Sequence, residues 1–162
     1  MFARDVARAL EEHGVEHCVV GGLAVNLYGI PRATYDVDIV VRREVDPLRR
    51  CREALEGLGL RCRLPLSLEA LAGESDEALR ARNLISVTFT DPNDPLREVD
   101  VLVAPPVPAG DLIARSCLME GAEIALRVVA LEDLVALKRA AGREQDLADV
   151  RHLERLLPRR RS

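Results

Sequence analysis

Hydrophobic and polar positions recur along this chain with two different periods, and each period predicts a different element. Apolar residues recur at helical spacing in residues 2–12, 46–56 and 111–116, and over a stretch long enough for two helices in residues 131–157. Short apolar runs typical of strands occupy residues 17–20, 60–64, 83–90, 97–103 and 122–129. The stretch 65–82 reads as a loop with poor helical turns. Strands interspersed with helices predict an α/β chain around a mixed sheet.

One stretch, residues 21–41, places a glycine pair ahead of regularly spaced polar residues. Gly21 and Gly22 end an apolar run and open a short helix, where unpaired backbone amides can face an anion. Gly29 ends this helix, and Pro31 fixes an extended exit. The glycine pair is therefore a candidate phosphate-binding turn.

Polar side chains then fall at every second position: Arg32, Thr34, Asp36 and Asp38. If residues 32–41 form a strand, these four share one face and the intervening Val and Ile residues share a buried face. Two carboxylates this close repel each other, and a shared divalent cation stabilises both as anions. The alternative is a polar face on an edge strand, which the poor strand propensity of Asp disfavours.

The pattern of Gly21-Gly22, thirteen residues, then Asp36-Val37-Asp38 and Ile-Val-Val resembles the signature of the DNA polymerase β-like nucleotidyltransferase superfamily. The form Arg32-x-Thr34-x-Asp36-x-Asp38 is most similar to the branch that contains the abortive-infection (AbiEii-type) toxin nucleotidyltransferases. The resemblance implies a two-layer α/β (α+β) core with a mixed β-sheet flanked by helices. Residues 1–130 are expected to form this core, and residues 131–162 a C-terminal helical segment packed on it, in a single compact domain.

A third acidic residue, Asp100, interrupts the apolar run 97–103, where an unpaired carboxylate is costly to bury. In the resembled superfamily a third carboxylate on a neighbouring strand completes the metal site, and Asp100 is the matching position. Glu98 on the same face is the alternative candidate. A purely structural alternative is an ion pair between Asp100 and Arg97 or Arg32.

The single lysine among 23 basic residues is Lys138. A compact ammonium group suits a phosphate better than a guanidinium fork does in a confined space. The pattern Lys138, Arg143, Asp146 and Asp149 resembles the late motif of the same toxin-like branch, in which a lysine and an acid line the nucleotide site. Lys138 and Asp146 would be nearly aligned on a continuous helix. The alternative is an exposed helix carrying ion pairs.

The resemblance implies a metal-dependent transfer of a nucleoside monophosphate from an NTP to an acceptor hydroxyl, with release of pyrophosphate. Two Mg²⁺ ions, for which Mn²⁺ can substitute, would be held by the catalytic residues Asp36, Asp38 and Asp100. The expected nucleotide-binding residues are Gly21, Gly22, Arg32, Thr34, Lys138 and Asp146. Many superfamily members carry Ser where this chain has Gly22, so phosphate binding here depends on backbone amides.

Three functions remain open at this point. The chain is expected to be a nucleotidyltransferase, with the toxin of a toxin–antitoxin pair as one form of that activity. The first alternative is a catalytically weak binding module, such as an antitoxin or a regulatory subunit. The second is a small-molecule (antibiotic) nucleotidyltransferase. The acceptor, whether tRNA, protein or small molecule, is left open, and a cognate antitoxin or other partner protein is compatible with each.

Composition limits the partners and the cellular location that we expect for this chain. A net charge of −4 and an aromatic content of 2% argue against strong unselective binding of nucleic acid, with Arg159–Arg161 interpreted as a solubilising tail. The four cysteines form no Cys-x-x-Cys pair, so a zinc ribbon or disulfide framework is not predicted. No window resembles a membrane span or a signal peptide. We therefore expect a cytoplasmic protein with no membrane partner.

Overall fold

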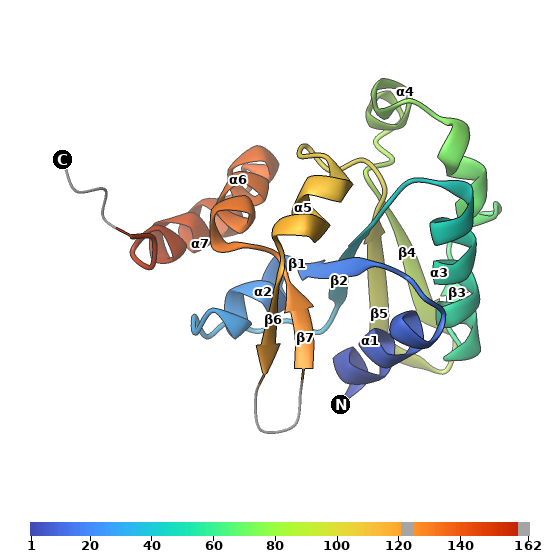
Figure 1. Cartoon of the computed structure of the whole chain (residues 1–162), viewed down its shortest axis with the longest axis horizontal. Helices are drawn as coiled ribbons and strands as arrows, with labels where there is room; N and C mark the ends of the chain where they lie inside the picture. Colours follow the sequence, from blue (N-terminus) through green and yellow to red (C-terminus); the bar gives the residue numbers. More distant parts are fainter. Residues whose placement is uncertain (121–124, 159–162) are drawn as a thin grey trace.

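Seven strands form one mixed sheet in the order β3-β4-β5-β2-β1-β7-β6 in the computed structural model, which describes residues 1–120 and 125–158 (Figure 1). The strands are β1 (His17–Val20), β2 (Val37–Val41), β3 (Arg61–Cys62), β4 (Ser86–Asp91), β5 (Asp94–Leu102), β6 (Cys117–Glu120) and β7 (Ala125–Val128). The β2–β5 and β1–β7 pairs are parallel, whereas the remaining neighbours are antiparallel. The sheet is therefore mixed, as predicted.

The central pair β2 and β5 carries the alternation that the sequence shows. Val37, Ile39 and Val41 on β2 are buried, as are Val99 and Val101 on β5. Asp38 on β2 and Asp100 on β5 point to the opposite face, together with the buried Val40, because successive strand residues alternate. Burial of the Val and Ile face fixes the register, since a slip of one residue would expose the whole apolar set.

Helices flank this sheet. They are α1 (Phe2–Glu12), α2 (Gly21–Leu27), α3 (Val45–Gly57), α4 (Asp76–Ala81), α5 (Ala109–Arg115), α6 (Leu131–Ala141) and α7 (Glu144–Glu154), with a 3₁₀ turn η1 (Leu68–Gly73). α1 packs on α3, α5 contacts β1 and β2, and α2 contacts α6. Figure 1 shows α6 and α7 at one end of the molecule and α3 with α4 at the other. No helix among the described residues is both long and apolar enough to cross a membrane.

The strand predicted over residues 32–41 begins only at Val37. The neighbouring strand β1 ends at Val20, which pairs with Asp38, so residues before 37 have no strand beside them on that side. The backbone amide of Arg32 instead donates to Asn26 Oδ1 at 2.9 Å. The prediction that Arg32, Thr34 and Asp36 share a strand face with Asp38 is therefore wrong, although the buried face was identified correctly.

The C-terminal region also differs from its prediction. Gly142 adopts a left-handed conformation (φ 65°) and ends α6, so Lys138 and Asp146 lie on two helices rather than on a continuous one. The strand predicted over 122–129 is found over 125–128, with residues 122–124 outside the described part. Its hairpin partner β6 was not predicted. Arg159–Arg161, interpreted as a tail, also lie outside the described residues.

Candidate active site

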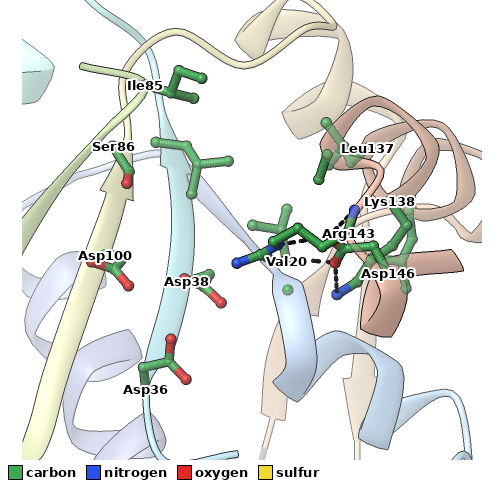
Figure 2. Close-up of a pocket in the computed structure, with 14 residues that line it drawn as sticks. Val20, Asp36, Asp38, Ile85, Ser86, Asp100, Leu137, Lys138, Arg143 and Asp146 are labelled. Carbon is green, nitrogen blue, oxygen red and sulfur yellow. Dashed lines mark hydrogen bonds and ion pairs between the residues drawn. The ribbon is translucent and has the colours of Figure 1, made fainter. Parts of the chain in front are cut away.

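Three carboxylates meet at the end of the central strand pair (Figure 2). Asp38 on β2 and Asp100 on β5 are direct partners in the parallel register, and Asp36 immediately precedes β2. One oxygen from each of the three carboxylates lies within 4.8 Å of the other two. Residues 62 positions apart therefore converge because β2 and β5 are hydrogen-bonded neighbours.

Two threonines orient these carboxylates. Thr34 Oγ1 donates a hydrogen bond of 3.1 Å to Asp36 Oδ1. Thr88, opposite Asp100 in the β4–β5 register, donates one of 2.5 Å to Asp100 Oδ1. Each hydroxyl occupies one oxygen, so the second oxygen of each carboxylate remains available to a ligand. Carboxylates that coordinate metal ions are commonly oriented by such a hydrogen bond from a neighbouring side chain.

The structural alternatives proposed for Asp100 do not occur. Arg97 pairs with Asp91, and Arg32 pairs with Asp149, so neither guanidinium neutralises Asp100. The alternative acid Glu98 forms an ion pair with Arg63 at 3.2 Å. Asp100, and not Glu98, is the acid that joins Asp36 and Asp38.

The electrostatics of the cluster favour a cation. Burial, followed by the charges of Asp36 and Asp100, raises the pKa of Asp38 to about 7, with Lys138 opposing the shift. Near neutral pH the cluster therefore gains from either a proton or a positive ion. A donor set made only of carboxylate oxygens suits hard divalent cations such as Mg²⁺ and Mn²⁺.

Gly21 lies directly against this cluster. Its φ of +67° is a conformation that side chains disfavour, and a Cβ added there would lie 2.0 Å from Asp38 Oδ2. At Gly22, an added Cβ would lie 3.0 Å from Thr34 Oγ1. The glycine pair therefore lets the turn between β1 and α2 lie against the carboxylates without covering them.

A cavity of about 290 Å³ opens beside the carboxylates, between the sheet and α6. Gly21 and the three aspartates line one end of it, and charged side chains of α6 and α7 line the helical side. Apart from Ser86, the remaining lining is aliphatic, from Val20, Ile85, Leu102, Leu134, Leu137 and Ala141. Figure 2 shows Ile85 and Leu137 facing each other across the upper part, away from the carboxylates. The cavity is thus charged beside the three aspartates and on its helical side, and apolar in the part between Ile85 and Leu137.

A charged network closes the helical side of this cavity. Lys138 Nζ lies 3.1 Å from Asp146 Oδ1 and 3.1 Å from Asp149 Oδ2, and all three side chains are buried. Arg143 Nε donates to Asp146 Oδ2 at 2.7 Å, and Arg32 pairs with Asp149. Burial alone would raise the pKa of Asp146, but hydrogen bonds from Arg143 and Lys138 outweigh it and hold the pKa below its usual value.

One known protein family matches almost the whole chain. The family described as "Nucleotidyl transferase AbiEii toxin, Type IV TA system" matches residues 6–159. The chain belongs to the AbiEii nucleotidyltransferase family. This confirms the resemblance that the aspartate and glycine spacing indicated. A search of curated protein sequences gives no match.

Solved structures share the fold of this AbiEii-family protein at low sequence identity. The antibiotic-resistance factor ANT(2'')-Ia has a TM-score of 0.66 and 13% identity, over 97% of this chain and 83% of that one. The lincosamide antibiotic adenylyltransferase LnuA has a TM-score of 0.59 and 13% identity, over 91% of each chain. A candidate nucleotidyltransferase from Thermotoga maritima has a TM-score of 0.59 and 14% identity, over 95% of this chain and 91% of that one. The predicted nucleotidyltransferase-type α/β fold is confirmed.

The AbiEii-family site brings most of the sequence-derived candidates together. Gly21, the three aspartates, Lys138 and Asp146 all line the cavity. Thr34 supports Asp36 from outside the lining, Gly22 lies beside Thr34, and Arg32 is engaged by Asp149. Lys138, for which a phosphate contact was expected, forms ion pairs with the carboxylates of Asp146 and Asp149.

Two residues of this site received no role from the sequence. Thr88 holds Asp100, and its position opposite Asp100 in the predicted hairpin is the signal that could have identified it. Arg143 belongs to the late motif, yet only the structure shows that it lines the cavity with an exposed side chain. Its orientation depends on the turn at Gly142, which the expected alignment of Lys138 with Asp146 did not include.

Proposed function

We propose that this AbiEii-family protein transfers a nucleoside monophosphate from an NTP to an acceptor hydroxyl and releases pyrophosphate. The observation that supports this most directly is the convergence of Asp36, Asp38 and Asp100 within 4.8 Å at the charged end of a cavity. Nucleotidyl transfer needs charge neutralisation and in-line alignment at the α-phosphorus, and such a cluster provides the anchor for both.

The carboxylates fit two divalent cations, Mg²⁺ or Mn²⁺, by their chemistry and spacing. In this proposal Asp36 and Asp38 would hold both ions, and Asp100 would hold the one on the acceptor side. When bound, the ions supply charge neutralisation at the triphosphate and activation of the attacking oxygen. Thr34 and Thr88 keep Asp36 and Asp100 oriented toward that centre.

The charged and aliphatic parts of the cavity lining suit the triphosphate and the nucleoside of a nucleotide, respectively. Its charged end, where Gly21 lies against Asp38, is proposed to receive the triphosphate, with the backbone amides of Gly21 and Gly22 as the proposed donors. Its aliphatic part suits the flat faces of the ribose and base. Lys138 and Arg32 contribute positive charge at a distance, because Asp146 and Asp149 already hold them.

In the proposed reaction the acceptor oxygen attacks the α-phosphorus while the bond from that phosphorus to the bridging oxygen of pyrophosphate breaks. The hydroxyl proton passes to Asp100 or to solvent. Asp100 is suited to receive it because Thr88 occupies only one of its carboxylate oxygens. The electron pair of the broken bond leaves with pyrophosphate, so the charges balance.

The acceptor separates two versions of this proposal. The family description names a toxin of a toxin–antitoxin system. In the first version the protein is therefore such a toxin, with an antitoxin as its partner and a macromolecule such as tRNA or protein as the proposed acceptor. A small-molecule acceptor is the second candidate, because ANT(2'')-Ia and LnuA share the fold over most of their length. A binding module without activity is disfavoured by the presence of all three carboxylates.

The deciding experiment incubates the protein with each α-labelled NTP, Mg²⁺ and pools of RNA, proteins and hydroxylated small molecules. We expect label transfer by the wild type and none by the Asp36→Ala/Asp38→Ala variant. Glu98→Ala, on the same strand as Asp100 but paired with Arg63, is the matched control and should keep activity. Label transfer that survives the double substitution refutes the metal assignment, and Mg²⁺-dependent NTP binding without transfer indicates the binding module.

A further inference from the structure

We propose that Arg143 is the side chain that binds the phosphates of the nucleotide, and that Asp146 is a positioning residue that aims it. This inference rests on the proposed nucleotidyl transfer and assigns the cationic contact within it. The expected cation was Lys138, and the structure gives a specific reason to assign the contact to its neighbour in the network.

The two cationic side chains of the cavity differ in how much of each a ligand can reach. Among the described residues that line the cavity, only Lys138 and Arg143 carry a positive charge. The Lys138 side chain is 8% exposed and its ammonium group lies 3.1 Å from each of two carboxylates. The Arg143 side chain is 79% exposed. A phosphate can reach the guanidinium without breaking a buried ion pair, which it could not do at Lys138.

Asp146 fixes the stem of Arg143 and leaves its tip available. Asp146 Oδ2 accepts hydrogen bonds from Arg143 Nε at 2.7 Å and from the Arg143 backbone amide at 3.2 Å. Nη2 lies 3.5 Å from Asp146 Oδ1, at the limit of a hydrogen bond, and Nη1 makes no hydrogen bond within residues 1–120 and 125–158. In Figure 2 the guanidinium extends from the helical side toward the carboxylates of β2 and β5.

The position of this guanidinium suits a group that is itself anionic and bound beside the aspartates. Arg143 feels the charges of Asp38 and Asp36 across the cavity. A triphosphate held against the aspartates by divalent cations would lie between them and the guanidinium. The planar fork of Arg offers parallel N–H donors to phosphate oxygens, so the contact adds both charge and geometry.

Lys138 keeps Asp146 in place for this role. Asp146 is 1% exposed and lies between Lys138 and Arg143. Because Lys138 Nζ holds Oδ1, the other oxygen faces the Arg143 Nε and backbone N–H groups. The network therefore acts on the nucleotide through Arg143, and the buried lysine does not need to touch it.

The test titrates the full chain first with Mn²⁺ alone and then, in saturating Mn²⁺, with inorganic tripolyphosphate and with a non-hydrolysable NTP. For Arg143→Gln we expect affinity for both phosphate ligands to fall roughly 10- to 100-fold, the loss of charge-assisted hydrogen bonds. Affinity for Mn²⁺ alone should be unchanged or higher, because a positive charge facing the aspartates has been removed. Arg151→Gln, an exposed arginine farther along α7, is the matched control and should bind like the wild type.

Asp146→Asn tests the positioning step. It should weaken tripolyphosphate binding while leaving Mn²⁺ affinity intact, and should cause little further loss when combined with Arg143→Gln. A structural role alone would make the two losses additive. Retained Mn²⁺ binding shows that each variant is folded, and Arg143→Lys, expected to be intermediate, replaces Arg143→Gln if that variant fails this check.

The outcomes separate the two proposals. If the wild type binds neither phosphate ligand in Mn²⁺, the proposed function fails and this inference fails with it. If the wild type binds both and Arg143→Gln binds equally well, only the assignment of Arg143 is overturned. Equal weakening by Arg151→Gln would also overturn it, because the effect would then be one of overall charge.

Discussion

At position 21 the absence of a side chain determines how closely the turn between β1 and α2 approaches Asp38. A Cβ there would lie 2.0 Å from Asp38 Oδ2, and the backbone φ of +67° is itself unfavourable for a side chain. The methyl group of Gly21→Ala must therefore displace the carboxylate or the turn. We expect this variant to lose most Mn²⁺ binding and nucleotidyl transfer, measured by calorimetry and label transfer.

Gly59→Ala is the control that separates steric overlap with Asp38 from strain in the backbone. Gly59 also has a positive φ, +85°, but a Cβ there would meet nothing within 4 Å. Both variants should lose a similar amount of stability from the strained backbone, whereas only Gly21→Ala should lose metal binding. Metal affinity equal to that of the wild type in Gly21→Ala would contradict the close approach.

Single residues show where sequence reasoning succeeded. Asp38 and Asp100 were identifiable because a carboxylate inside a Val and Ile strand conflicts with its neighbours, and such conflicts mark functional sites. The position of the Arg32 side chain could not be predicted, since its partner Asp149 lies 117 residues away. Local alternation assigned Arg32 to a strand face, but a contact with α7 determines where the side chain lies.

Among the elements, α6 and α7 depend on the buried charges of the network. Lys138 is 6% exposed and neutralises Asp146 and Asp149, which are 1% and 3% exposed. Lys138→Met keeps the apolar stem and removes the ammonium group. The two buried carboxylates therefore lose one of the positive charges that neutralise them. We expect the free energy of unfolding to fall by about 3–5 kcal/mol, measured by urea denaturation.

The neighbouring residue provides the control for this prediction. Arg139 also lies in the last turn of α6 and pairs with Glu154 on α7, but its side chain is 59% exposed. Arg139→Met should cost no more than about 1 kcal/mol, because water screens an exposed pair. Equal losses in the two variants would mean that the Lys138 network contributes no more than a surface ion pair.

The helical hairpin also shows why element boundaries were harder to predict than element types. Helical spacing across residues 131–157 indicated enough chain for two helices, but the pattern placed no break between Lys138 and Asp146, which were expected to be nearly aligned on a continuous helix. Gly142 breaks it because glycine adopts the left-handed C-cap conformation at little cost. Lys138 and Asp146 still meet, through the turn rather than through alignment along one helix. β6 was missed because its residues are mostly exposed and show no buried face.

For the molecule as a whole, the sheet order explains why distant sequence motifs form one site. β2 lies between β1, which leads into Gly21, and β5, which carries Asp100, while α6 contacts α2 and lines the same cavity. The proposed division into a core of residues 1–130 and a C-terminal segment of 131–162 thus places the site between the two. Metal binding there should therefore influence the stability of the whole chain.

The pKa of Asp38 determines how the stability of the chain changes with pH, without and with a bound metal ion. Its pKa is raised from 3.8 to about 7 in the folded protein, so between these values the folded state holds a proton that the unfolded state has lost. Without metal, this carboxyl therefore makes folding less favourable as pH rises from about 4 to 7, by at most about 1.4 kcal/mol per pH unit. A bound cation stabilises the ionised form and should reverse the trend.

We expect Mn²⁺ affinity to increase as pH rises toward 7 and to level off above it, with a proton released on binding below pH 7. Calorimetry at pH 6 and pH 8, in two buffers of different ionisation enthalpy, measures the released proton directly. Thermal unfolding with and without Mn²⁺ should show a larger stabilisation at pH 8 than at pH 6.

Asp38→Asn should remove the part of the metal-free pH dependence that belongs to this carboxyl, because an amide does not titrate in this range. A metal-free stability curve that is identical in Asp38→Asn and the wild type between pH 4 and 7 would show that another group carries the proton. The charge balance of the three aspartates would then have to be assigned differently.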